Sequence, residues 1–163
     1  MATYQAIAAV SAALRALLSN AAIPPISGAE FLVVNADSLQ SPMADGLGVF
    51  LYRASVNTAI HTVPGRPPLA LDLHYFVTAW SGDPIRQQLL LGWAARRLED
   101  SPILTSAMLN QHAPAPGVFR PDESVELAAE SLNIQDEVSV WNAVKALQQP
   151  SVSYVARGVR IDS

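Results

Sequence analysis

Residues 69–80 have the sequence LALDLHYFVTAW, and this stretch decides the fold class. Two sets of side chains alternate along it, which is the period-two pattern of a β-strand. The first face carries Leu69, Leu71, Leu73, Tyr75 and Val77. The opposite face carries Ala70, Asp72, His74, Phe76 and Thr78. We therefore predict a strand whose first face covers the core, while its second face is mixed and not wholly polar.

Helical patterns lie on both sides of this strand. In residues 3–20, an apolar stripe is formed by Ile7, Val10, Leu14 and Leu17. After the strand, Asp83 provides an N-cap and Pro84 a first-turn proline. The helix that follows has a broad apolar face made by Ile85, Leu89, Leu90, Trp93, Ala94 and Leu98. Asn133 caps a last helix, ended by Pro150, whose inward residues are Val138, Trp141, Val144 and Leu147.

Four further segments have the composition of strands, namely 31–35, 49–56, 124–132 and 152–161. In the last one, Val155, Val159 and Ile161 share one face, and Val152, Tyr154 and Ala156 share the other. Residues 103–109 are predicted to form a short helical turn. Segments 36–46 and 111–122 are rich in turn-forming residues and are predicted to be loops, and 57–68 is predicted to be a connection, either a long hairpin arm or a mobile loop. This order predicts an α+β fold, with a mixed, mostly antiparallel sheet and about three helices, in a single domain of residues 1–163.

The composition excludes several classes of function. The formal charge is −4, and Arg96-Arg97 is the only adjacent pair among the ten Lys and Arg residues, so there is no basic face for nucleic acid. The chain has no cysteine, which excludes disulfides and thiolate metal sites. The apolar stretch 6–18 contains Arg15 and is too short to span a bilayer. We therefore predict no targeting segment and no membrane insertion.

Candidates for catalytic or metal-binding chemistry are few. The three histidines, His61, His74 and His112, lie in separate segments and give no metal-binding spacing. Gly46-Leu47-Gly48 precedes a predicted strand, whereas phosphate-binding glycines precede a helix, so we interpret it as a turn. No serine or threonine has a recognisable partner for nucleophilic catalysis. We predict no catalytic residue, no cofactor and no metal.

Asp72 and His74 lie two residues apart on one face of the predicted strand, so their side chains can point together. Two ligands are too few for a metal site, and no third is near in the sequence. We favour a pair that forms hydrogen bonds locally or to a neighbouring subunit. An enzyme that uses these two residues is the alternative.

Several collinear motifs resemble one protein family. The most specific is RPPLALDLHY at residues 66–75, preceded by YQAIAAV at 4–10 and GVFLYRASVN at 48–57. LLG at 90–92 and SPIL at 101–104 follow, and then Trp141 before Ser153-Tyr154. In this order they resemble the N-terminal domain of cap proteins from antifeeding-prophage and virulence-cassette type contractile injection systems. The resemblance covers nearly the whole chain, although some members of the family carry a further C-terminal region.

The resemblance implies a phage tail-terminator-like fold and a structural role. Such proteins form a sixfold ring on the last layer of inner tube and contractile sheath and stop polymerisation. The implied partners are copies of the chain in a hexamer, sheath subunits and inner-tube subunits, with no nucleic acid and no membrane insertion. The implied location is the bacterial cytoplasm during assembly, within a phage tail-like particle. A small adaptor that links the particle to a membrane or host component is the alternative function.

Ring contacts commonly come from loops and strand edges. We therefore take as candidate interface residues Arg66, Asp72, His74, Tyr154, Arg157 and Arg160. Arg157 and Arg160 lie on the last predicted strand, where we expect them to meet acidic neighbours.

Overall fold

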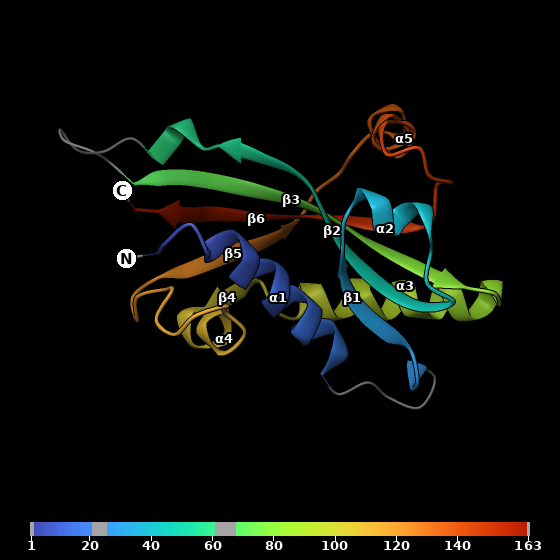
Figure 1. The fold of residues 1–163 in the computed structure, drawn as a ribbon, viewed down its shortest axis with the longest axis horizontal. Coiled ribbons are helices and arrows are strands. Elements are labelled where there is room, and N and C mark those ends of the chain that lie inside the picture. The colour runs from blue at the N-terminus through green and yellow to red at the C-terminus, as the bar shows by residue number, and fades with distance from the viewer. Residues whose placement is uncertain (1, 21–25, 61–67, 163) are drawn as a thin grey trace.

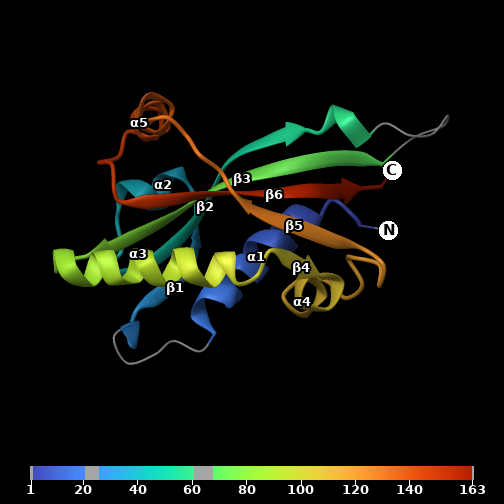
Figure 2. The ribbon, with the colours of Figure 1, turned by 180° about the vertical axis from the view of Figure 1, so that it is seen from behind.

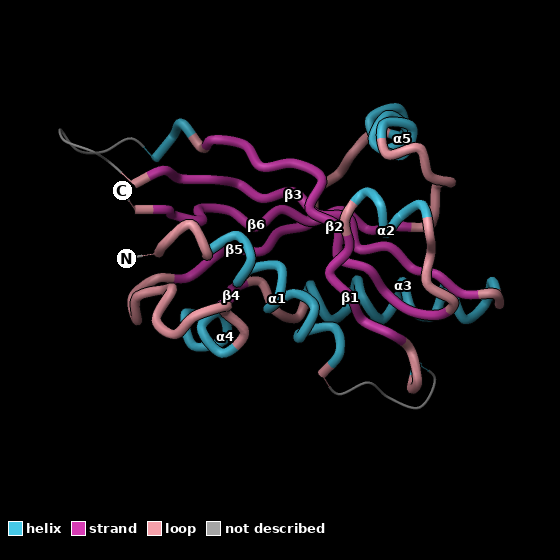
Figure 3. Tube along the Cα trace, in the orientation of Figure 1, coloured by secondary structure: helices cyan, strands magenta, loops and turns pink. Residues whose placement is uncertain are grey.

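A computed structural model describes residues 2–20, 26–60 and 68–162. Within these residues, one six-stranded sheet has the order β1-β2-β3-β6-β5-β4 (Figures 1 and 3). Its strands are β1 (Glu30–Val34), β2 (Asp45–Val56), β3 (Leu69–Ser81), β4 (Ile103–Thr105), β5 (Ser124–Ala129) and β6 (Ser151–Ile161). β1 and β2 run parallel, and the other four neighbouring pairs are antiparallel. The predicted α+β fold with a mixed, mostly antiparallel sheet is therefore confirmed.

Strand β3 occupies the middle of the sheet and is paired with β2 on one edge and with β6 on the other. Leu71, Leu73, Tyr75 and Val77 face the main core, as predicted. Leu69, at the start of the strand, is 45% exposed. Phe76 and Trp80 on the opposite face are also buried. β3 therefore contributes buried apolar side chains to both faces of the sheet.

Helices lie on both faces of the sheet (Figures 1 and 2). α1 (Ala6–Ser19), α3 (Pro84–Glu99) and α4 (Ser106–Gln111) contribute to the main core on one face. α2 (Ala36–Gln40) and α5 (Ile134–Ala143) pack on the other. A short 3-10 helix, Thr58–Ile60, follows β2. None of the helices in the described part of the chain has both the length and the apolar character needed to cross a membrane.

Helix α3 packs beside α1, and its side chains also donate hydrogen bonds to the last turn of α1. The indole Nε1 of Trp93 donates to the carbonyl of Leu18 at 3.1 Å. The guanidinium of Arg97 donates to the carbonyl of Leu17 at 3.3 Å. Carbonyls in the last turn of a helix lack donors from their own helix, so these two side chains supply hydrogen-bond donors that α1 itself cannot provide.

A second, smaller cluster covers one half of the opposite face. It consists of Val34, Leu39, Phe50, Phe76, Trp80 and Trp141. The ring of Phe76 is stacked between Tyr52, at 4.5 Å between centroids, and Trp141, at 6.4 Å. The predicted inward position of Trp141 on α5 is confirmed. This cluster explains why the second face of β3 carries aromatic side chains.

The segment 36–46, predicted to be a loop, is partly helix and partly strand. The side-chain oxygen of Asn35 accepts a hydrogen bond from the Ser38 amide at 2.9 Å and so caps α2. β2 begins at Asp45, so Gly46 and Gly48 lie inside a strand and the predicted turn is wrong. A Cβ at Gly48 would lie 2.5 Å from the Trp80 ring, and one at Gly46 would collide with a backbone carbonyl of β1. These glycines allow neighbouring groups to approach the backbone closely.

Residues 103–109, predicted to form a helical turn, are also part strand and part helix. Residues 103–105 form β4, because Leu104 pairs with Val125 and is completely buried. α4 starts only at Ser106, where the hydroxyl of Thr105 accepts from the Met108 amide. With α2 and α4, the described chain has five α-helices, two more than the three main helices predicted.

Two predicted apolar faces are narrower than expected. On α3, Leu90, Ala94 and Leu98 are buried, whereas Ile85 is 65% and Leu89 49% exposed. α5 ends at Ala143, well before Pro150, and the chain then passes through a left-handed residue, Lys145, with a φ of 56°. Leu147 is therefore not on the helix and is 85% exposed, contrary to the prediction.

A β-bulge changes the faces of β6. Arg157 and Gly158 together oppose Asp72 of β3, and Gly158 has a φ of 74°, which favours glycine. The extra residue shifts the alternation by one. Val159 consequently faces the main core with Tyr154 and Ala156. The prediction that Val159 shares a face with Val155 is wrong for this reason.

We expect Gly46→Ala to lower the free energy of unfolding by about 1–3 kcal/mol, because the added methyl group meets the Glu30 backbone. Gly92→Ala is the matched control, since a Cβ there meets nothing within 4 Å. Gly92 lies in the exposed interior of α3, so its replacement should stabilise the protein by about 0.5–1 kcal/mol. Urea unfolding of both variants measures the difference, and equal effects would contradict the close packing at Gly46.

The ion pair between Asp45 and Arg86 predicts a pH dependence. Both carboxylate oxygens of Asp45 accept from Arg86 at 2.7 Å, and this hydrogen bonding lowers the pKa of Asp45 below its usual 3.8. A lowered pKa stabilises the fold above the unfolded-state pKa, and that contribution is lost as the pH falls through the folded-state pKa. We expect Asp45→Asn to lower the urea midpoint at neutral pH, and the deficit to disappear as the pH falls from 3.8 through the lower folded-state pKa of Asp45. A deficit that persists in acid would contradict this assignment.

Candidate assembly surface

Five of the six candidate interface residues lie on β3 and β6, while Arg66 lies outside the described residues. Asp72, His74, Arg157 and Arg160 are on the sheet face opposite α1, beyond the second cluster. We call this region the open face and define it by these four residues together with Glu126 of β5. It is polar, whereas the other half of the same face is covered by α2 and α5.

Asp72 fixes the bulge in β6. The side-chain Nδ2 of Asn57 donates to both carboxylate oxygens of Asp72 at 3.1 Å. The backbone N–H of Gly158 donates to Oδ1, also at 3.1 Å. One carboxylate on the central strand therefore joins the end of β2 to the left-handed glycine of β6.

His74 lies at the centre of a separate hydrogen-bond network. Its Nε2 is 2.9 Å from the hydroxyl of Ser55 on β2, and its Nδ1 is 2.9 Å from Oε1 of Glu130, just after β5. The other oxygen of Glu130 accepts from the Tyr52 hydroxyl at 2.8 Å. Burial, and then the hydrogen bond to Glu130, raises the pKa of Tyr52 above its usual value of 10.0. The network joins β2, β3 and the segment that leads to α5.

The order of Ser55, His74 and Glu130 is that of an acyl-transfer triad, a pairing that could not be recognised from the sequence. Because an ionised carboxylate only accepts, a neutral His74 donates from Nδ1 to Glu130 and accepts from Ser55 at Nε2. Acyl transfer also needs donors for the oxyanion and a cavity for substrate. The two cavities described below are lined by other residues. Ser55 itself lies within the ladder between β2 and β3. The arrangement thus favours a structural network.

Asp72 and His74 each have their own partners, and the structure records no hydrogen bond between them. The sequence did not reveal these partners, because Ser55 and Glu130 are 19 and 56 residues from His74. Among residues 2–20, 26–60 and 68–162, no group of three or more His, Asp or Glu side chains could hold a metal ion.

Tyr154 lies on the opposite side of the sheet from the open face and is buried, with an exposed fraction of 4%. Its hydroxyl donates to Glu99 at 2.9 Å and contacts the Ala95 carbonyl at 3.3 Å, both on α3. Burial, and then the hydrogen bond to Glu99, raises its pKa above the usual 10.0. Tyr154 thus connects β6 to α3, and its role in an interface stays a prediction.

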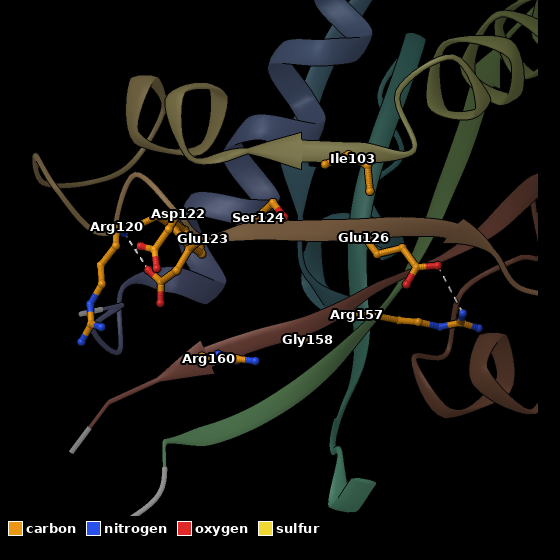
Figure 4. A pocket seen from close by; sticks show the side chains of 10 residues that line it. Ile103, Arg120, Asp122, Glu123, Ser124, Glu126, Arg157, Gly158 and Arg160 are labelled. Carbon is orange, nitrogen blue, oxygen red and sulfur yellow. Dashed lines mark hydrogen bonds and ion pairs between the residues drawn. The ribbon is translucent and has the colours of Figure 1, made fainter. Parts of the chain in front are cut away.

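Arg157 and Arg160 line a cavity of about 340 Å³ between β5 and β6 (Figure 4). We call this cavity the notch. Arg157 lies 3.6 Å from Glu126, so the acidic neighbour expected for it is found within the chain. The notch is closed on one side by the turn that carries Phe119, Arg120 and Asp122. The side chain of Arg160 makes no hydrogen bond or ion pair with any described residue.

A second cavity, of about 170 Å³, lies beside α2. It is lined by Leu39, Gln40, Pro42, Trp80, Lys145, Ala146, Leu147 and Gln149. The indole nitrogens of Trp80 and Trp141 are buried and have no hydrogen-bond partner among the described residues. Both rings serve the apolar packing of the second cluster.

Comparison with known proteins gives one family and two similar structures. The model of the family described as the Pvc16 N-terminal domain matches residues 9–163. The fold is similar to the sheath/tube terminator of the PVC extracellular contractile injection system in its extended state. That match has a TM-score of 0.58 and 14% identity, and covers 100% of this chain and 58% of the other.

The fold is also similar to the tube-terminating cap of the anti-feeding prophage, with a TM-score of 0.55 and 16% identity. This match covers 96% of the chain and 54% of the cap, so the chain spans little more than half of either solved protein. No curated protein sequence matches the chain. The two matches confirm the predicted tail-terminator-like fold.

We expect His74→Ala to destabilise the protein by about 1–3 kcal/mol, because Glu130 and Ser55 both lose a half-buried partner. Arg160→Ala is the control on the same face, and its effect should stay within about 0.5 kcal/mol, since it breaks no described contact. Urea unfolding of the two variants tests this. If His74→Ala is as stable as Arg160→Ala, the network does not hold the three segments together.

Proposed function

Because the chain belongs to the Pvc16 N-terminal domain family, we propose that it is a structural terminator of a contractile injection system. In this role it binds the end of the inner tube and sheath and prevents further subunits from adding. The observation that carries the proposal is the family match over residues 9–163. The similarity to a sheath/tube terminator and to a tube-terminating cap supports it, as far as the fold goes.

The two edges of the sheet suit a ring. β1 and β4 are the outermost strands of the described sheet, and they differ from each other. The β1 edge exposes Leu32 (43%) and Val33 (47%), and β4 exposes Ile103 (49%). A contact that joins two unlike surfaces is heterologous, and it generates a ring when the rotation closes. We propose that copies of the chain join in this way, with six copies as the family resemblance implies.

The proposed partners are sheath and inner-tube subunits of the same particle, and the proposed site of assembly is the bacterial cytoplasm. A polymer end presents the same surface as every earlier layer, so a terminator must match that surface and offer nothing equivalent beyond it. We propose that the chain does this by shape alone and is not an enzyme. The Ser55–His74–Glu130 network supports this view because it joins three segments of the fold.

Deletion of the gene should give particles without a cap and with abnormal lengths, because nothing then stops the growth of tube and sheath. Electron micrographs of purified particles would measure both properties, and restoring the wild-type gene is the control. Particles of normal length with an intact cap would contradict the proposal.

A further inference from the structure

The notch exists because β5 and β6 pair over only part of their lengths and then separate. Their ladder runs from Ala129↔Tyr154 to Glu126↔Arg157 and stops there. β5 nevertheless begins at Ser124, and β6 continues to Ile161 with β3 on its other edge. Figure 4 shows the result, with Ser124 and Glu126 on one wall and Arg157 and Arg160 on the other. Residues 158–161 span about 10 Å of strand at the usual rise per residue.

The backbone of Arg160 points into the notch. Its partner on β3 is Ala70, whose carbonyl accepts from Asn57 at 2.9 Å on the β2 side. The N–H and C=O of one strand residue point toward the same edge, so Ala70 directs both groups away from β6. Arg160 therefore lies opposite Ala70 without a backbone bond to it. Its own N–H and C=O point away from β3, toward β5.

The backbone of Ser124 points into the notch from the other wall. Leu127 donates its N–H to the Pro102 carbonyl on the β4 side, at 2.8 Å. Glu130 donates to Ser153 of β6 at 2.9 Å. By alternation, even-numbered residues of β5 direct their backbone groups toward β6, and Ser124 is one of them. The ladder stops before Ser124, so both walls present backbone donors and acceptors without a strand between them.

Just after β6, the backbone already forms one hydrogen bond to the N-terminal segment. The N–H of Asp162 donates to the carbonyl of Ala2 at 2.8 Å. The side chain of Asp162 lies 3.4 Å from Arg120, and this exposed ion pair borders the mouth of the notch. On the β6 wall of the notch, the guanidinium of Arg160 is exposed and has no partner among the described residues, whereas Arg157 faces Glu126 and the lining also includes Asp122 and Glu123. An unpaired cation beside free backbone groups is suited to an extended peptide that carries a carboxylate.

We propose that the notch binds a short extended segment, bearing a carboxylate, from a different polypeptide of the same particle. The segment forms backbone hydrogen bonds with Arg160 and Ser124, and its carboxylate pairs with the Arg160 guanidinium. The described strands of a second copy are already paired within its own sheet, so we assign the segment to a different subunit, and the cross-linking experiment below distinguishes the two sources. This inference rests on the proposed function, since it needs a particle that supplies the segment.

Substitutions at Arg160 separate the backbone contact from the charge. Arg160→Ala removes only the cation, Arg160→Lys keeps a cation, and Arg160→Pro removes the cation and the N–H. Proline is tolerated at an edge position whose N–H is unpaired, so the last variant should fold. Arg53→Ala, an exposed arginine on β2, is the matched control for loss of charge. Circular dichroism and thermal unfolding establish that all four variants fold.

Binding of each variant to purified particles that lack the cap, measured by co-sedimentation, is the test. We expect Arg160→Pro to bind about three- to tenfold more weakly than Arg160→Ala, which corresponds to one backbone hydrogen bond. Arg160→Ala should bind more weakly than Arg160→Lys, and Arg53→Ala should match wild type. If folded Arg160→Pro binds as wild type does, the notch is not used. If wild type itself fails to bind, the proposed function is wrong instead.

A photo-reactive benzoylphenylalanine at Ser124 identifies the occupant in assembled particles. We expect a cross-link to an extended segment of another subunit, located by mass spectrometry near an acidic residue or a chain terminus. A cross-link to a second copy of this chain, or none at all, would overturn the assignment.

Discussion

The double pairing of β3 is the constraint on which the rest of the structure depends. β2 holds one edge of this strand and β6 the other, so its polar backbone is satisfied only when both are in register. Its side chains then have to be buried on both faces. The main core covers Leu73 and Tyr75, and the second cluster covers Phe76 and Trp80. Helices on both sides of the sheet follow from this requirement.

Local departures from regular pairing create the notch and the exposed position of Arg160. The bulge at Gly158 turns Val159 into the core and leaves Arg160 on the open face. Asp72 holds that bulge through a half-buried hydrogen bond to Gly158, two residues before the exposed Arg160. A polar residue in a central strand normally carries a desolvation cost, and here hydrogen bonds from Asn57 and Gly158 offset it.

A terminator has to bind one end of a polymer without extending it, and this places unequal demands on its surfaces. The described chain is unequal in the corresponding way. Half of one sheet face is sealed by α2 and α5, while the other half is polar and borders a cavity. The two outer strands also differ in length and in their exposed residues. Unlike surfaces of this kind can form a heterologous contact, which generates a ring when its rotation closes.

The sequence by itself determined the central strand, the caps at Asp83 and Asn133, and the α+β class. These features depend on residues close together along the chain. It also supported the terminator-like fold through motifs in a fixed order. The pairing of Ser55 and Glu130 with His74, the shifted face of Val159 and the notch were decided only by tertiary structure. Each depends on strand register, which joins residues far apart in sequence and which a single bulge moves by one position.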